Sequence, residues 1–223
     1  VPGAWSDHTV LAKAVATAST GGAHLELEPH DPDLQRAMFV GSGRSFDDAT
    51  NAAIAAHTSV ACLSFEKTPP GIEEIVAGSI AALRDLGGHA VNVPKSGLSH
   101  GWERWQKFMA TPSADALLQV LVLQVPDRRS DRLCSFGMKQ FGKADACVTR
   151  DATSTESAWV VFEFNRYAWV QQPTLKSGNT FSRNLSGATK YKLVLEQDRR
   201  YDAKHDFHNP FGVWDLTPVA AGR

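Results

Sequence analysis

The sequence predicts an α+β fold: a mixed, largely antiparallel sheet with helices packed on it, in a single layered domain over residues 1–223. Segments with the apolar spacing of helices and segments with that of strands interleave irregularly. Two expected strands near the middle of the chain are close enough to form a hairpin. The 223 residues are also enough to bury a substantial core.

Residues 1–65 predict two helices and three strands. Apolar residues at helical spacing favour a helix over 10–18. Alternation of apolar and polar residues predicts a strand over 23–28, and a short apolar run predicts another over 37–40. The alanine-rich segment 46–56 begins with aspartates, which the positive end of a helix dipole favours. The compact run 58–65 is typical of a buried strand.

The middle of the chain predicts two helices around a short strand, followed by a central strand. An apolar stripe over 72–83 indicates an amphipathic helix. Residues 90–93 predict a brief strand, 95–100 a loop, and 102–109 a short helix rich in aromatic residues. The most hydrophobic segment, 116–125, predicts the central strand because parallel or central strands read as continuous apolar runs.

The last third predicts a hairpin, a helix and a final strand. The hairpin pairs 133–138 with 146–149. Serine and threonine residues with capping chemistry precede an aromatic-rich helix over 159–170. Alternation over 189–196 predicts the last strand. The tail, 197–223, carries too many charges, histidines and prolines to predict any element.

Composition and cysteine number limit the environment and the partners. The net charge of −1 provides no basic excess to hold a phosphate backbone, so we expect no nucleic-acid partner. No apolar run approaches the roughly 18 residues of a membrane helix, so we expect no membrane association. Cys62, Cys134 and Cys147 form an odd set in apolar surroundings, which predicts buried thiols in a reducing, cytoplasmic compartment.

Four short segments resemble one bacterial family, the domain of unknown function 4261, in their order along the chain. The main segment is 136–145, in which glycine-punctuated apolar residues enter a strand. The others are 55–57, 96–98 and 175–180. The resemblance spans about 10–196 and leaves the tail outside. It implies a compact, mixed, intracellular domain and supplies no catalytic residue to carry over.

The segment Gly137–Lys143 also has the Gly-x-x-x-x-Gly-Lys pattern of a phosphate-binding loop. Such a loop needs a serine or threonine after the lysine to bind magnesium, and Ala144 stands there. It also needs a following helix, whereas Asp145–Thr149 has the pattern of a strand. We therefore interpret the segment as a structural hairpin and expect no cofactor.

Gly97–Gly101 matches the Gly-x-Ser-x-Gly nucleophile elbow of serine hydrolases. In that reading Ser99 is the nucleophile, and His205 or His208 downstream supplies the base. Pro94–Ser96 separates the preceding strand from the motif, whereas an elbow requires an abrupt junction. A serine hydrolase is therefore kept as an alternative function.

A candidate metal site is formed by Asp202, His205 and His208, because three such side chains on one helix face could hold a metal ion. Asn209-Pro210 argues against a continuing helix there. Solvated loop histidines are our interpretation, and a metal-dependent enzyme is the remaining alternative.

Aromatic residues are more numerous on the two aromatic-rich helices than one inward face needs. Most are expected in the core, but Trp102, Trp105 and Trp169 are candidates for binding a partner. With no assembled catalytic group, we expect a non-catalytic, protein-binding or accessory module, for example of the immunity type that neutralises another protein. The expected state is a monomer or homodimer.

Overall fold

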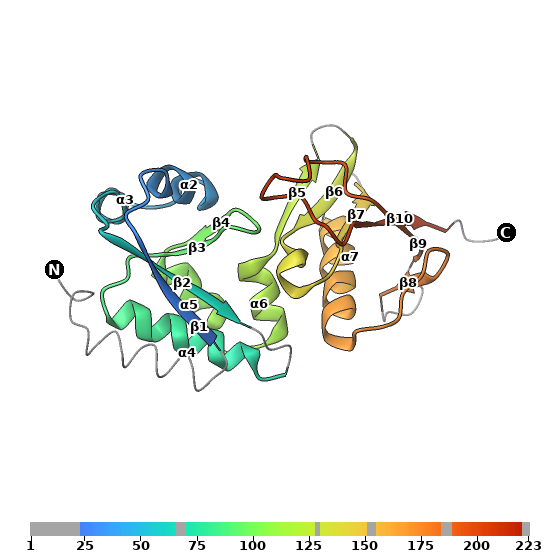
Figure 1. The fold of residues 1–223 in the computed structure, drawn as a ribbon. Coiled ribbons are helices and arrows are strands. Elements are labelled where there is room, and N and C mark those ends of the chain that lie inside the picture. The colour runs from blue at the N-terminus through green and yellow to red at the C-terminus, as the bar shows by residue number, and fades with distance from the viewer. Residues whose placement is uncertain (1–22, 66–69, 128–129, 151–154, 184–188, 220–223) are drawn as a thin grey trace. The chain divides into compact units, whose positions relative to one another are not determined.

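The computed structural model describes residues 23–65, 70–127, 130–150, 155–183 and 189–219. The helix expected over 10–18 lies outside these stretches. Contacts divide the chain into two compact units (Figure 1). The first unit comprises Val1–Val93 and Gly97–Val120, and the second comprises Pro94–Ser96 and Leu121–Arg223. The expectation of a single domain stays a prediction, while the α+β class is confirmed by the mixture of helices and sheets.

The first unit contains two small antiparallel pairs of strands and five helices among its described residues. Its elements in order are β1 Ala23–Pro29, α2 Leu34–Gly41, α3 Asp48–Ala55, β2 Ser59–Phe65, α4 Ile72–Asp85, β3 Val91–Val93, β4 Leu98–His100, α5 Trp102–Met109 and α6 Ala114–Leu121. Strand β1 pairs with β2, and β3 pairs with β4. Leu25 of β1 packs against Leu83 of α4, so the apolar stripe predicted for this helix faces the β1–β2 ribbon. Asp47 caps α3 by accepting the Thr50 amide at 2.6 Å.

The second unit is built on one six-stranded sheet with the order β5-β6-β7-β10-β9-β8. Its elements are β5 Leu123–Asp127, β6 Arg132–Phe136, the 3₁₀ helix η2 Met138–Phe141, β7 Asp145–Thr149, α7 Thr155–Arg166, the π-helical turn η3 Tyr167–Gln171, β8 Thr180–Ser182, β9 Lys190–Glu196 and β10 Val213–Pro218. Neighbouring strands are antiparallel except β7 and β10, which are parallel. The sheet is therefore mixed and largely antiparallel, as predicted.

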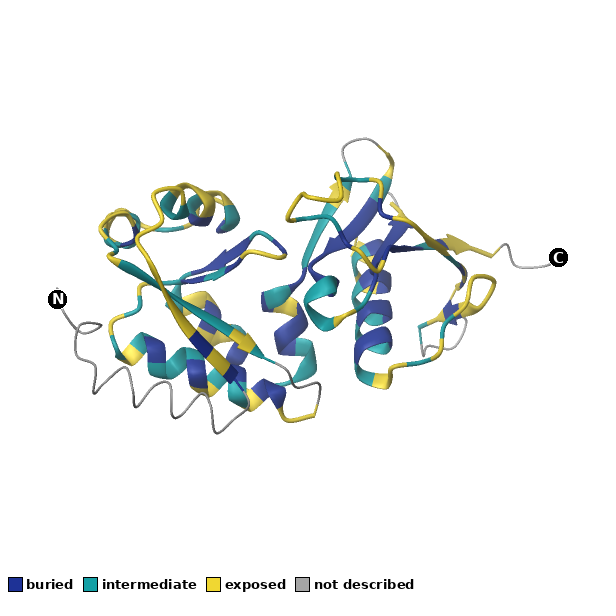
Figure 2. Cartoon of the chain, viewed as in Figure 1, coloured by how far each residue is buried: buried dark blue, intermediate teal, exposed yellow. Residues whose placement is uncertain are grey.

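One face of this sheet is covered by α7 (Figure 1). Alternate strand residues such as Val148 and Leu216 point to that face, because side chains of a strand alternate between its two sides. They pack with Val160 and Phe164 of α7, which are fully buried. Figure 2 shows buried positions in dark blue along this helix and the central strands.

The opposite face carries the intervening residues of the same strands. Cys134 of β6 and Cys147 of β7 lie directly opposite each other and form a disulfide. This disulfide corrects the prediction of buried free thiols, although Cys62 is a free cysteine. The segment 197–212, hereafter the C-terminal loop, packs on this face through Tyr201 and Phe207.

Four sequence predictions are wrong, and two of them concern apolar segments. Residues 37–40 belong to helix α2, and 116–125 forms helix α6 followed by β5. Both runs are too short or too uniformly apolar for periodicity to separate a strand from a buried helix. Residues 98–100 form strand β4 instead of loop, and 189–196 is followed by a further strand, β10.

Candidate functional site

The C-terminal loop is held on the sheet by a partly buried arginine, Arg200. The guanidinium of Arg200 donates to Asp145 at 2.7 Å and to Asp198 at 2.9 Å. It also donates to the carbonyl oxygen of Ser135 at 3.0 Å and lies 4.2 Å above the ring of Phe136. Both carboxylates are buried, so each needs this charged partner to offset the loss of water.

The two carboxylates differ in how the fold changes their acidity. Burial raises the pKa of Asp145, and the charge of Arg200 only partly opposes this effect. Burial acts in the same direction on Asp198, but hydrogen bonds from the side chain and amide of Arg200 and the amide of Asn209 outweigh it, so the pKa of Asp198 is lowered. Burial opposes ionisation of Arg200 too, yet the two carboxylates raise its pKa.

Lys139 of η2 provides a second anchor. Its Nζ donates to the carbonyl oxygen of Asp206 and, at 3.1 Å, to that of His208. Burial and the positive charge of Lys95 lower the pKa of Lys139. Lys139 therefore provides a hydrogen-bond donor to two backbone carbonyl groups of the C-terminal loop, near the point where the chain turns back towards β10.

Asn209 closes the loop from the inside. Its amide donates to the Asp198 carboxylate at 2.9 Å, and its side-chain nitrogen donates to the carbonyl of Lys143 at 3.0 Å. Its side-chain oxygen accepts the amide of Phe211 at 3.0 Å. Backbone groups that lack a strand partner are thus satisfied by side chains, as an ordered loop requires.

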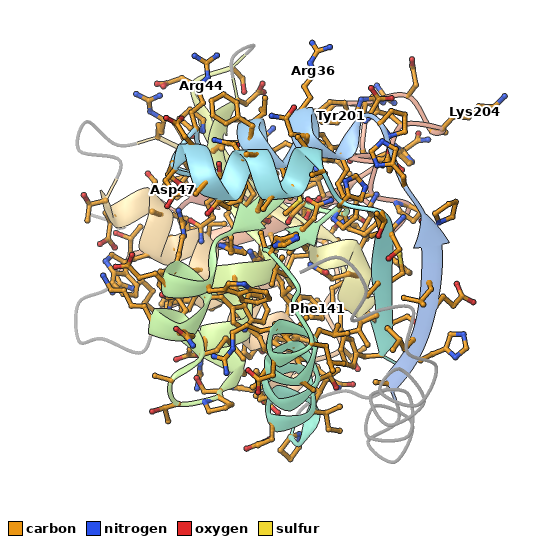
Figure 3. All side chains as sticks on the ribbon, turned by 90° about the vertical axis from the view of Figure 1, so that its left-hand side faces the viewer. Arg36, Arg44, Asp47, Phe141, Tyr201 and Lys204 are labelled. Carbon is orange, nitrogen blue, oxygen red and sulfur yellow. A yellow bond between two sulfur atoms is a disulfide. The ribbon has the colours of Figure 1, made fainter. Side chains whose placement is uncertain are left out.

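Aromatic rings cover the outer part of the anchored loop. Tyr201 stacks on His205 with ring centroids 4.5 Å apart, and Phe207 meets Tyr201 edge-on at 5.6 Å. Tyr201 also packs edge-on against Phe136 beneath the loop. The tip is exposed, and Figure 3 shows Lys204 extending away from the protein.

Two large apolar side chains remain exposed where the loop rejoins the sheet. Phe211 is 48% exposed and Leu195 of β9 is 45% exposed. Both lie next to Gly212, whose φ of +88° and close approach to the carbonyl of Glu196 leave no room for a side chain. These two residues are called the Phe211–Leu195 patch.

The Gly137–Lys143 segment forms the turn of the β6–β7 hairpin, as predicted. Gly137 has a φ of +114°, and a Cβ there would lie 2.8 Å from the carbonyl oxygen of Leu121. The amide of Lys143 donates to the carbonyl of Met138, and strand β7 begins two residues later. Without a helix after the lysine, the segment lacks the geometry of a phosphate-binding loop.

Ser99 lies within strand β4 and is 1% exposed. Its hydroxyl donates to the side-chain oxygen of Asn92 at 3.0 Å. A nucleophile elbow instead holds its serine on a sharp turn between strand and helix, where the hydroxyl projects outwards. Ser99 belongs to the first unit, whereas His205 and His208 belong to the second.

His100, next to Ser99, is also buried. One ring nitrogen lies 2.7 Å from the carbonyl of Val120, and burial lowers the pKa of the imidazole. Its ring packs beside Trp105. It therefore links β4 to α6 within the core of the first unit.

The candidate metal ligands Asp202, His205 and His208 lie in the C-terminal loop, where both histidine rings contact backbone groups of the loop. The ring Nδ1 of His205 accepts the amide of Phe207 at 3.0 Å, and Nδ1 of His208 lies 3.3 Å from the carbonyl of Tyr201. In the described part of the chain, no three His, Cys, Asp or Glu side chains gather as metal ligands. The structure does not bring this trio together as the metal alternative requires.

The three tryptophans proposed as partner-binding residues lie mostly in the core. Trp105 is 4% exposed and Trp169 is 1% exposed, with Trp169 stacked on Phe141 at 4.1 Å. Trp102 is half-buried, and its indole nitrogen donates to the carbonyl of Gly88 at 2.9 Å. These contacts agree with the core interpretation.

Sequence reasoning missed the Phe211–Leu195 patch. Leu195 lies in a predicted strand, where alternation suggests an inward side chain, and Phe211 follows Asn209-Pro210 in a tail without periodicity. An exposed tryptophan, Trp159 of α7, does show the aromatic surplus that the sequence predicted.

Comparisons with known proteins provide no relative: no family model, curated protein or solved structure matches the chain. Among the described residues, no helix is both long and apolar enough to span a membrane.

Proposed function

We propose that the chain is a non-catalytic protein-binding module that contacts its partner through the C-terminal loop and the Phe211–Leu195 patch. The observation that carries this proposal is the exposure of Phe211, on a loop that polar anchors hold in place, together with that of Leu195 on strand β9. Exposed apolar residues that gather at one place are typical of interaction sites, and Phe211 and Leu195 both lie next to Gly212.

The anchoring supports binding because an ordered loop loses little conformational entropy when a partner docks. Arg200, Lys139 and Asn209 fix the loop from below, so Phe211 is presented from a defined backbone. Aromatic residues are enriched among those that dominate binding energy, and Phe211 is the exposed aromatic ring of this patch.

The biological setting is proposed on the resemblance to the domain of unknown function 4261 family. On that basis we propose an accessory role in a bacterium, of the kind in which one protein neutralises or escorts another. The cytoplasmic location stays a prediction. The Cys134–Cys147 disulfide weighs against a strongly reducing compartment, because disulfides persist mainly in oxidising ones.

Affinity capture of the full chain from its native cells, with quantitative mass spectrometry, tests the proposal. We expect a stoichiometric partner that is retained by wild type and lost with Phe211→Ser. Val40→Ser is the matched control, because Val40 is 62% exposed but lies in the first unit. Equal recovery with both variants, or no stoichiometric partner at all, would refute the proposal. Light scattering of the free chain identifies the case in which the partner is a second copy.

A further inference from the structure

The Cys134–Cys147 disulfide lies beneath the C-terminal loop, where it contacts the loop's anchor. Both cysteines are 1% exposed and pack in a cluster with Phe136, against which Tyr201 and Phe207 of the loop also pack. The bridge therefore joins the sheet at the place where the loop covers it. Because both sulfurs are buried there, we expect a reagent to reach them only when the loop moves away from the sheet.

The two sulfurs have different surroundings. A guanidinium nitrogen of Arg200 lies 4.0 Å from Sγ of Cys147, at the limit of a hydrogen bond to sulfur. A neighbouring arginine stabilises a thiolate relative to the thiol, and the better stabilised thiolate is the better leaving group in thiol–disulfide exchange. No comparable cation contact is found for Cys134 among the described residues. When the bridge opens, the negative charge therefore goes to Cys147.

We propose that Cys134 and Cys147 are a redox-active pair whose disulfide is opened by a cellular thiol or dithiol, with Cys134 as the attacked sulfur and Cys147 as the leaving group. The thiolate of a dithiol reductant attacks Sγ of Cys134, the bond between the two protein sulfurs breaks, and its electron pair stays on Cys147. The second thiol of the reductant then displaces Cys134. The products are a Cys134 thiol, a Cys147 thiolate and one oxidised dithiol, so two electrons and one proton pass to the protein and the second proton passes to water.

Reduction acts on the loop through Arg200. The new thiolate at Cys147 competes with Asp145 and Asp198 for the same guanidinium. Opening of the disulfide also removes the covalent link between β6 and β7 on the face that the loop covers. The reduced protein should therefore hold its C-terminal loop less firmly than the oxidised protein, whatever the loop binds.

Peptide mapping of the folded full chain after incubation with glutathione tests the assignment. A Cys62→Ala variant removes the free cysteine from the readout. After quenching with N-ethylmaleimide, we expect glutathione on Cys134 and maleimide on Cys147. Glutathione mainly on Cys147, or opening of the bridge only under denaturing conditions, would overturn the proposal.

The dependence on loop opening has its own test. Lys139→Ala removes one anchor without touching either cysteine. We expect it to speed reduction of the folded protein about fivefold, the factor to which one net hydrogen bond corresponds. Arg84→Ala removes an exposed ion pair in the first unit and should leave the rate unchanged. Equal rates for Lys139→Ala and Arg84→Ala would contradict gating by the loop.

Discussion

The two faces of the second unit's sheet are covered in different ways. Helix α7 covers one face with fully buried apolar side chains such as Val160 and Phe164. The C-terminal loop covers part of the other face, where Arg200, Lys139 and Asn209 supply directed polar contacts. Apolar packing provides most of the stability of a fold, whereas buried polar contacts fix one arrangement. The comparison indicates that the face covered by α7 provides most of the stability, whereas the contacts on the opposite face hold the C-terminal loop in one arrangement.

The largest expected effect is on the helix-covered face. Phe164→Ala should lower the free energy of unfolding by about 3–5 kcal/mol, because it leaves a cavity among fully buried residues. Trp159→Ala on the same helix is the control, since its ring is 50% exposed and should cost far less. Urea unfolding of both variants measures the difference, and similar losses would contradict the assignment of this face as the core.

A smaller loss is expected on the loop-covered face. Asp198→Asn removes a buried negative charge beside Arg200, which keeps Asp145 as a partner, and should lower the free energy of unfolding by about 1.5–3 kcal/mol. The loss should be concentrated in the loop. Limited proteolysis should therefore cut within 197–212 first, while α7 stays intact. Cleavage in α7 at the same rate would show that the loop is not a separate layer.

The pH dependence of the two carboxylates should have opposite signs. The lowered pKa of Asp198 stabilises the fold above the pKa of the unfolded chain, about 3.9, and this contribution is lost as the pH falls through the lower folded value. The deficit of Asp198→Asn should therefore shrink below about pH 4. The raised pKa of Asp145 contributes stability at low pH, which is lost as the pH rises through its folded value. The deficit of Asp145→Asn should grow on acidification.

Denaturant titrations between about pH 3 and pH 7 measure both deficits on the same scale. Parallel curves for Asp198→Asn and Asp145→Asn would contradict the different surroundings assigned to the two carboxylates.

The smallest effect on stability is expected at the exposed patch. Phe211→Ser should change the free energy of unfolding by no more than about 0.5 kcal/mol, because half of the ring is already in water. The same variant is expected to lose the partner. A thermal melt alongside the capture experiment separates the two effects, and a large fall in melting temperature would make Phe211 part of the core.

Local patterns predicted the helix-covered face well. Strand alternation in the β6–β7 hairpin and helical spacing over 159–170 are both visible in neighbouring residues. The amphipathic helix α4 was found for the same reason. The apolar segment of α6 was not, because a short helix whose leucine and valine residues are mostly buried has the same apolar character as a buried strand.

The loop-covered face was not predictable from local pattern. Its contacts join residues far apart in the sequence: Arg200 meets Asp145 55 positions away, and Lys139 meets His208 69 positions away. Each charged residue alone suggests a solvated tail. The Cys134–Cys147 bridge was missed because an odd cysteine count argued against any disulfide, although the predicted hairpin already placed the two residues on adjacent strands.

Amide hydrogen exchange of the C-terminal loop, resolved by NMR, tests most directly whether the loop is a fixed surface. The amides of Arg200 and Asn209 donate to the Asp198 carboxylate, and that of Phe211 donates to Asn209. These three should be strongly protected in the wild-type protein, and the first two should lose much of that protection in Asp198→Asn. Exchange of all three at the rate of an unstructured peptide would contradict an anchored loop and remove the basis of the proposed binding surface.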